Sequence, residues 1–268
     1  MFTSSTLFSM VGGGDSGRQE PGDRDGEAAA GAALEPPWRS VPRRRGVPRP
    51  QLSRDAIVAA ALKVVETDGG DALTMRRVAD QIGVSASALY GYVANKEELV
   101  QLVLEQIITE IPIPAAAGRW QDTMRTFARE MLGAFRRHPG VAALTLGRVP
   151  FGPSLLPGAE YMLGILRAAG LPDQVAAFAG DFASLYVGAF AYEQDVSPVA
   201  ERADMAAQAA AWLGSLPAGQ FPNLVAVAAK MVAGSADDRF EWGLDVIVRG
   251  LGTFLTAPPS ADARWPQG

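Results

Sequence analysis

Residues 72–98, ALTMRRVADQIGVSASALYGYVANKEE, carry the pattern that decides the fold. A hydroxyl residue, Thr74, precedes an eight-residue stretch, 75–82, and can cap a helix there. Gly83 follows, and glycine readily takes the left-handed conformation that ends a helix at a tight turn. The buried stripe of this helix would consist of Val78, Ala79 and Ile82.

A second helix is expected directly after that turn, over residues 86–93, with Ser85 as its N-cap. Leu89 and Val93 would face inward. The next helix would begin after Asn95, and Glu98 at its third position could complete a capping box. Two short helices joined by a glycine turn predict a helix-turn-helix.

The second of these helices has no charged side chain and presents hydroxyls and small apolar groups, which suit base edges in a major groove. Lys96, at the positive end of the following helix, suits a phosphate. A small helical bundle with ordinary caps would explain the caps equally well, but not the tyrosines beside Lys96. The candidate DNA contacts are Thr74, Arg76, Ser85, Ala86, Ser87, Tyr90, Tyr92 and Lys96.

Charge is divided unevenly along the chain. The net charge is -5. Residues 36–96 nevertheless carry ten Lys and Arg against five Asp and Glu, whereas residues 97–268 carry twelve against eighteen. A basic segment joined to an acidic one fits phosphate attraction at one end.

The composition excludes several kinds of chemistry. The chain has no cysteine and one histidine, so disulfides, thiolate metal sites and histidine clusters are impossible. We expect His138 to be structural, and Glu193 with Asp195 lacks a nucleophile, base or ligand set beside it. The prediction is therefore a non-enzymatic protein without cofactor or metal.

Helical periodicity continues on both sides of the quoted stretch, and no strand pattern appears. A first helix is expected over about 53–67, and the helix over 96–110 alone would link the two parts of the protein. The later helices are expected at 118–137, 138–146, 154–169, 173–194, 200–213 and 237–255, with a break at 219–222. The fold class is therefore all-α, with nine or ten helices.

Four segments follow from these patterns. Residues 1–50 are predicted to be a disordered extension, and 258–268 a disordered tail. Residues 51–98 would form the helix-turn-helix domain and 99–257 a larger helical domain, for which the family resemblance given below implies regulation and dimerisation. The extension ends in a basic arm, Trp38, Arg39, Arg43, Arg44, Arg45 and Arg49, which would contact DNA or be a solvated linker. A start assigned too far upstream would also account for residues 1–35.

We expect a cytoplasmic protein. Its longest uncharged run, 205–229, is interrupted by prolines, and its N-terminus lacks the basic start of a signal peptide.

One further run has the character of a family signature: Leu89, Tyr90, Tyr92, Val93, Asn95, Lys96 and Leu99. This run resembles the end of the recognition helix in the TetR family of bacterial repressors, and most of all its tetracycline-repressor-like branch. Tyr92 stands where that branch often has histidine. The likeness is specific over about 53–103 and weaker, though traceable, to residue 255.

The resemblance implies a function for the remaining helices. Residues 188–195 and 240–251 are similar to the two helices that form a four-helix bundle between subunits, and the helices before them would enclose an inducer pocket. Thr145 falls where the branch has a magnesium-ligating histidine, while Glu193 matches a carboxylate of the branch. We therefore expect a bulky, mainly apolar inducer without magnesium. The candidate ligand contacts are Trp120, Met124, Phe127, Met131, Thr145, Phe178, Phe182, Tyr186 and Glu193.

The helix-turn-helix pattern predicts DNA binding, and the resemblance implies a ligand-responsive transcriptional regulator. It would be a repressor that binds a palindromic operator in double-stranded DNA as a homodimer and is released by a small molecule. The alternative is a constitutive or architectural DNA-binding protein whose helical domain only dimerises.

Overall fold

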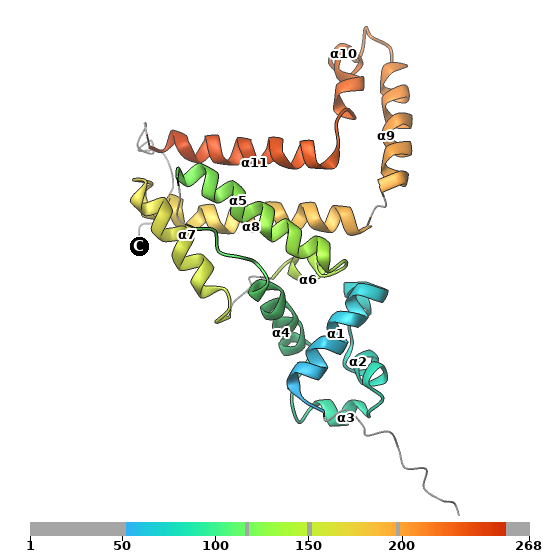
Figure 1. Cartoon of the computed structure of the whole chain (residues 1–268). Coiled ribbons are helices and arrows are strands. Elements are labelled where there is room, and N and C mark those ends of the chain that lie inside the picture. The colour runs from blue at the N-terminus through green and yellow to red at the C-terminus, as the bar shows by residue number, and fades with distance from the viewer. Residues whose placement is uncertain (1–51, 116–117, 149–151, 197–198, 256–268) are drawn as a thin grey trace, which may run out of the picture. The chain divides into compact units, whose positions relative to one another are not determined.

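The computed structural model describes residues 52–115, 118–148, 152–196 and 199–255, without the side chains of 199–203. Within these ranges the chain is all-α, as predicted, with eleven α-helices and one short 3-10 helix, η1 (Gly70–Ala72) (Figure 1). The proposed disordered extension, the basic arm and the whole of the C-terminal tail lie outside the described residues.

The N-terminal helices are α1 (Arg54–Asp68), α2 (Met75–Ile82), α3 (Ala86–Leu89) and α4 (Lys96–Thr109). We call α1 to α3 the head. The predicted caps of α1, α2 and α4 are confirmed, since the side chains of Ser53, Thr74 and Asn95 each accept a backbone N–H of the first turn. Val78 and Ala79 are buried and Ile82 is half-buried. Gly83 is left-handed, with φ +79°, as the turn requires.

Three local predictions were wrong. The second helix of the motif is only Ala86–Leu89; turns follow it over residues 90–92, and Val93 is still buried. Ser85 is the N-cap residue of α3, as predicted, but its side chain makes no capping bond; its hydroxyl instead bonds that of Ser87 at 2.9 Å. Glu98 accepts the N–H of Ala94 at 2.6 Å, one residue before the N–H that a capping box requires.

The body consists of α5 to α11. Its central helix is α8 (Asp173–Val196), which packs against α5 (Trp120–Arg137), α6 (Ala142–Thr145), α7 (Leu156–Ala168) and α11 (Ala236–Thr253). By length and composition α8 could cross a membrane, but Val175, Ala179 and Val187 are buried among these neighbours, as in the core helix of a helical domain. The turn 138–141 precedes α6 and does not belong to it, so this short helix begins later than predicted.

Helices α9 (Val199–Gly214) and α10 (Pro222–Met231) form a hairpin and pack chiefly against each other. Helix α10 was not predicted, because Pro222 was taken only as part of the break at residues 219–222. Proline is also a good first residue of a helix, and Pro222 begins α10 in this way.

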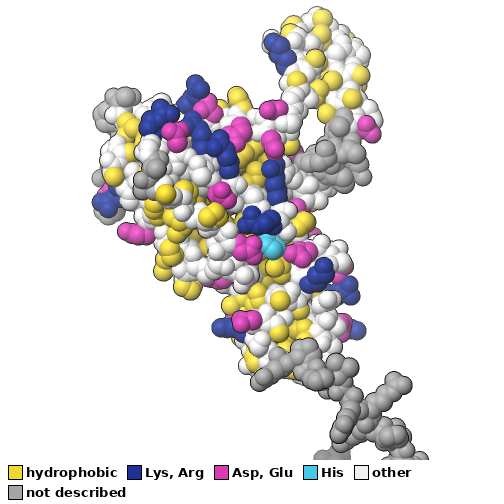
Figure 2. All heavy atoms as spheres, in the orientation of Figure 1, with side chains coloured by type: hydrophobic (Ala, Val, Ile, Leu, Met, Phe, Trp, Pro, Cys, Tyr) yellow, Lys and Arg dark blue, Asp and Glu magenta, His cyan; other side chains and the backbone are white. Residues whose placement is uncertain are grey.

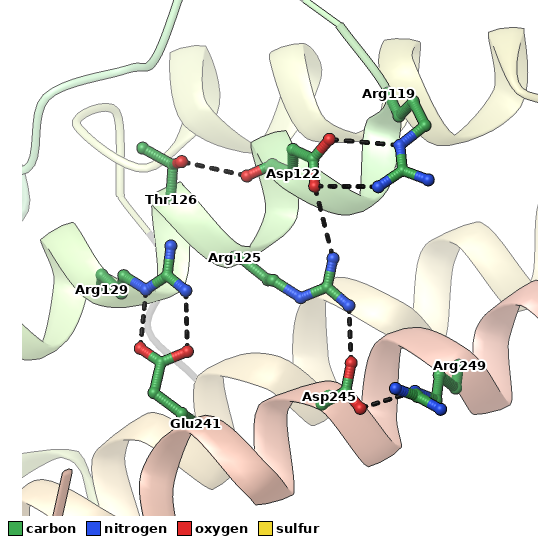
Figure 3. A network of polar contacts seen from close by, with 8 residues as sticks. All are labelled: Arg119, Asp122, Arg125, Thr126, Arg129, Glu241, Asp245 and Arg249. Carbon is green, nitrogen blue, oxygen red and sulfur yellow. Dashed lines mark hydrogen bonds and ion pairs between the residues drawn. The ribbon is translucent and has the colours of Figure 1, made fainter. Parts of the chain in front are cut away.

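A row of ion pairs on the protein surface joins α5 to α11 (Figure 3). Arg129 makes two hydrogen bonds to Glu241, at 2.6 and 2.7 Å, and Arg125 bonds Asp245 at 2.7 Å. These contacts hold the final helix against a helix that lines the cavity described below.

Candidate DNA-binding surface and ligand cavity

Four exposed candidate DNA contacts of the head lie on α3 or directly beside it. Ser85, Ser87, Tyr90 and Tyr92 are all exposed, the two tyrosines by 56 % and 43 %. Because α3 is short, these hydroxyls project from one turn of helix and the turns that follow it. Large exposed aromatic side chains with hydroxyl tips suit a polar partner such as a DNA backbone.

The remaining candidate DNA contacts have different surroundings. Arg76 is exposed, with Asp80 4.0 Å away, whereas Ala86 and Lys96 are half-buried. Lys96 is the first residue of α4, so its charge lies at the positive end of that helix. Thr74 is exposed and its side chain caps α2, which gives it a structural role in addition to any DNA contact.

The body contains a cavity of about 390 Å³, within the size range of small-molecule sites. Its walls come from α4, α5, α7 and α8, from the end of α6 and from the segments that follow α4 and α6, and they are mostly apolar. The lining residues are Leu104, Ile107, Ile108, Thr109, Ile111, Ile113, Phe127, Met131, Phe135, Thr145, Leu146, Gly147, Arg148, Ser154, Leu155, Pro157, Gly158, Asp181, Ser184, Leu185, Gly188 and Ala189.

The structure brings three of the nine candidate ligand residues, Phe127, Met131 and Thr145, to this cavity. The other six lie elsewhere. The apolar stripe of α5 is wide. Phe127 and Met131 on this stripe line the cavity. Trp120 and Met124 are buried but do not line the cavity. Helical spacing shows that a stripe is buried but does not show whether it faces a core or a void.

The four candidates on α8 occupy three different environments. Phe178 and Phe182 are exposed, by 46 % and 55 %. Tyr186 stacks on Phe240 at 5.5 Å and donates its hydroxyl to the Phe240 carbonyl. Glu193 accepts a hydrogen bond from Arg239 at 2.6 Å. The cavity instead uses Asp181, Ser184, Leu185 and Gly188 of this helix, which the sequence analysis missed.

Three hydroxyls at the cavity wall donate their protons within the protein. Thr109 donates to the Gln106 carbonyl at 2.6 Å, Thr145 to the Ala142 carbonyl at 2.7 Å, and Ser184 to the Gly180 carbonyl at 2.8 Å. Each hydroxyl oxygen therefore presents lone pairs. The Asp181 carboxyl adds an acceptor and Arg148 adds donors.

Gly188 explains how Thr145 reaches the cavity wall. A Cβ at this buried position would lie 3.1 Å from the Thr145 hydroxyl oxygen, so glycine permits α6 to approach α8 closely. No local sequence pattern marks Gly188, because Thr145, the residue it lies against, is 43 residues earlier in the chain.

Helix α4 is not the sole connection between head and body, contrary to the prediction. Helix α6 also packs against η1, and a Cβ at Gly70 would lie 2.9 Å from the Ala143 Cβ. The turn before α6, residues 138–141, also lies close to α1, since a Cβ at Gly140 would be 2.7 Å from the Val65 carbonyl oxygen. The segment 138–148 therefore runs from the head to the cavity wall.

A helix-turn-helix attached to a helical body with an apolar cavity defines a class, the ligand-responsive DNA-binding repressors. Two family descriptions match the chain: "Bacterial regulatory proteins, tetR family" over residues 57–103 and "Tetracyclin repressor-like, C-terminal domain" over residues 113–255. The chain belongs to the TetR family.

Known proteins similar to this chain agree with that assignment. The HTH-type transcriptional repressor DrrR1 of Streptomyces coeruleorubidus is 31 % identical over 247 residues, which cover 89 % of this chain and 91 % of the relative. The class C tetracycline repressor protein of Escherichia coli is 30 % identical over 206 residues, covering 75 % and 91 %. The structure of ActR from Streptomyces coelicolor in complex with actinorhodin is 38 % identical, covers 78 % of this chain and 99 % of its own, and has a TM-score of 0.71.

Proposed function

We propose that this protein represses transcription by binding a palindromic operator as a homodimer, and that an aromatic small molecule in the body cavity releases it. The observation that carries the proposal is the cavity, whose wall includes residues of α4 and of the segment that packs against the head. The relative ActR was solved with actinorhodin bound, which supports a small-molecule effector. We place the protein in the cytoplasm and assign it no catalytic activity.

The exposed faces of α8 and α11 support the homodimer. Phe182 on α8 is 55 % exposed, and Trp242 and Val246 on α11 are 70 % and 50 % exposed. Helices α8 and α11 pack against each other and expose apolar side chains. These side chains suit a four-helix bundle with α8 and α11 of a second copy of the chain. Such a two-fold dimer would present two heads to two half-sites about 34 Å apart.

The cavity wall favours a particular ligand chemistry. Its apolar side chains, with Phe127 and Phe135 among them, suit a bulky ring system. The hydroxyls of Thr109, Thr145 and Ser184 already donate to backbone carbonyls, so their oxygens can accept hydrogen bonds from a ligand. We infer an aromatic ligand that carries hydroxyl donors. A magnesium-bound tetracycline is disfavoured, because Thr145 replaces imidazole with a neutral hydroxyl and Glu193 pairs with Arg239.

We propose the domain limits that the sequence suggested: an extension over 1–50, a DNA-binding domain over 51–98, a regulatory domain over 99–257 and a tail over 258–268. The two matched family ranges, 57–103 and 113–255, support a division near residue 100.

The test is to select a duplex from a random pool and to titrate its complex with three sets of compounds. These are polyhydroxylated aromatics, their methyl ethers, and tetracycline with magnesium. We expect release by the first set. Release by tetracycline that a chelator abolishes would overturn the proposed ligand class, and no response to any compound would favour a constitutive DNA-binding protein.

A further inference from the structure

The single histidine of the chain bridges two carboxylates from different helices. His138 Nδ1 lies 2.8 Å from the Glu66 carboxylate on α1, and Nε2 lies 2.9 Å from the Glu110 carboxylate at the end of α4. His138 itself follows the last residue of α5. One side chain thus joins the head, the linking helix and the body.

This geometry favours the charged form of the imidazole. A neutral imidazole has one N–H and one lone pair, so one ring nitrogen would face a carboxylate with its lone pair. Only the imidazolium donates from both nitrogens, and each bond is then charge-assisted. The side chain is 15 % exposed, so solvent screens the bridge only partly.

Other charged groups around the turn leave the bridge intact. Arg137 approaches Glu110 from α5, 3.7 Å from its carboxylate, and donates to the Glu110 carbonyl at 3.3 Å. From α8, Asp195 accepts the N–H of Gly140 at 2.9 Å. In Figure 2 the histidine is visible at the surface with acidic side chains on both sides.

Burial opposes a charge on His138, but the hydrogen bonds and charges of Glu66 and Glu110 outweigh it and leave its pKa raised. The bridge is therefore complete below the ordinary histidine pKa of about 6.5 and is lost as pH rises through the higher folded value.

We propose that His138 is a positioning residue: its imidazolium, held between Glu66 and Glu110, fixes the head on the body and so sets the orientation of both heads on a two-fold operator. The inference rests on the proposed function. A head held in one orientation loses less freedom when both half-sites are occupied, so the bridge strengthens binding to a full site more than to a half-site.

The first measurement uses free protein and needs neither DNA nor ligand. Because the chain has one histidine, ¹⁵N and ¹³C signals of the imidazole belong to His138 without assignment. We expect the imidazole pKa to lie above the ordinary value of about 6.5, and Glu66→Gln to lower it. Amide hydrogen exchange should rise at the end of α1 in His138→Gln. It should not rise in Arg136→Gln, a control whose guanidinium bonds Gln194 and Asp237 elsewhere on the body.

The second measurement is the affinity for a selected palindrome relative to one half-site, as a function of pH. In His138→Gln this preference should fall by about tenfold, the size of one charge-assisted hydrogen bond. In the native protein the preference should fall as pH rises through the histidine pKa. In His138→Arg, which keeps a charge at every pH, it should persist.

The outcomes separate the two proposals. An imidazole pKa at or below the ordinary value of about 6.5, or unchanged exchange and unchanged preference in His138→Gln, would overturn the role of His138. If the native protein showed no preference for the palindrome, the proposed dimeric operator complex would fail, and the imidazole signals and hydrogen exchange would still decide whether the bridge positions the head.

Discussion

Single hydroxyl, amide and imidazole groups decide much of the local geometry of this protein. Thr74 and Asn95 bond the first turns of α2 and α4, and Thr145 places a lone pair at the cavity wall. His138 joins three helices through two bonds. A change of one atom at these positions should therefore have a specific and measurable effect.

Lys96→Ala should weaken binding to selected and unrelated duplexes alike, because we expect Lys96 to neutralise one phosphate. The slope of log affinity against log salt concentration should become smaller by about 1. Filter binding at several salt concentrations measures this slope. Lys230→Ala, which removes an exposed charge on α10, is the matched control. A loss confined to the selected duplex would instead make Lys96 a base contact.

Thr145→Val should lower the affinity for a hydroxylated aromatic ligand by about threefold to tenfold, the worth of one neutral hydrogen bond. Valine keeps the shape of threonine and removes the acceptor. The affinity for the methyl ether of the same ligand should hardly change, since the ether has no proton to donate. Calorimetric titration of both compounds checks this, and equal losses for the two would refute the acceptor role.

At the scale of elements, the contact between α5 and α11 depends on ion pairs across their surface (Figure 3). The hydrogen bonds from Arg129 hold the pKa of the Glu241 carboxyl below its usual range, more strongly than burial raises it. Both side chains are about half exposed, at 50 % and 43 %, so solvent screening limits the free energy involved.

A double-mutant cycle of Arg129→Gln and Glu241→Gln should give a coupling of about 0.2–1 kcal/mol in the free energy of unfolding at neutral pH. Because the folded pKa of Glu241 is lowered, this stabilisation is present above the ordinary carboxyl pKa of about 4.3 and lost as pH falls through the folded value. Urea unfolding at neutral pH and at a pH below the carboxyl pKa measures this coupling. A coupling that persisted in acid would mean that the pair contributes through packing alone.

At the scale of the whole molecule, the exposed faces of α8 and α11 should decide the oligomeric state. Val246→Glu places a charge in the centre of the proposed bundle, where no partner could neutralise it, and should yield a monomer in sedimentation experiments. Its affinity for a palindrome should fall to that for a half-site. Leu156→Glu, at a position 66 % exposed on α7, is the control and should remain dimeric. A dimeric Val246→Glu protein would place the interface elsewhere.

The sequence by itself determined the elements whose causes are local. A cap and its bonded N–H lie three residues apart at Thr74 and Asn95, and the turn after α2 needs only the left-handed Gly83. The helices and the helix-turn-helix were therefore predictable. Where two local preferences competed, as at Ser85 or at Pro222, the sequence pattern did not show which would prevail.

Only the tertiary structure decided which faces of those helices enclose a cavity. Met124 and Met131 belong to one apolar stripe of α5. Met131 lines the cavity, whereas Met124 is buried in the core. The bridge from Glu66 to His138 and Glu110 spans 72 and 28 residues. Periodicity within a helix reports burial alone, and contacts at such separations depend on how the helices pack.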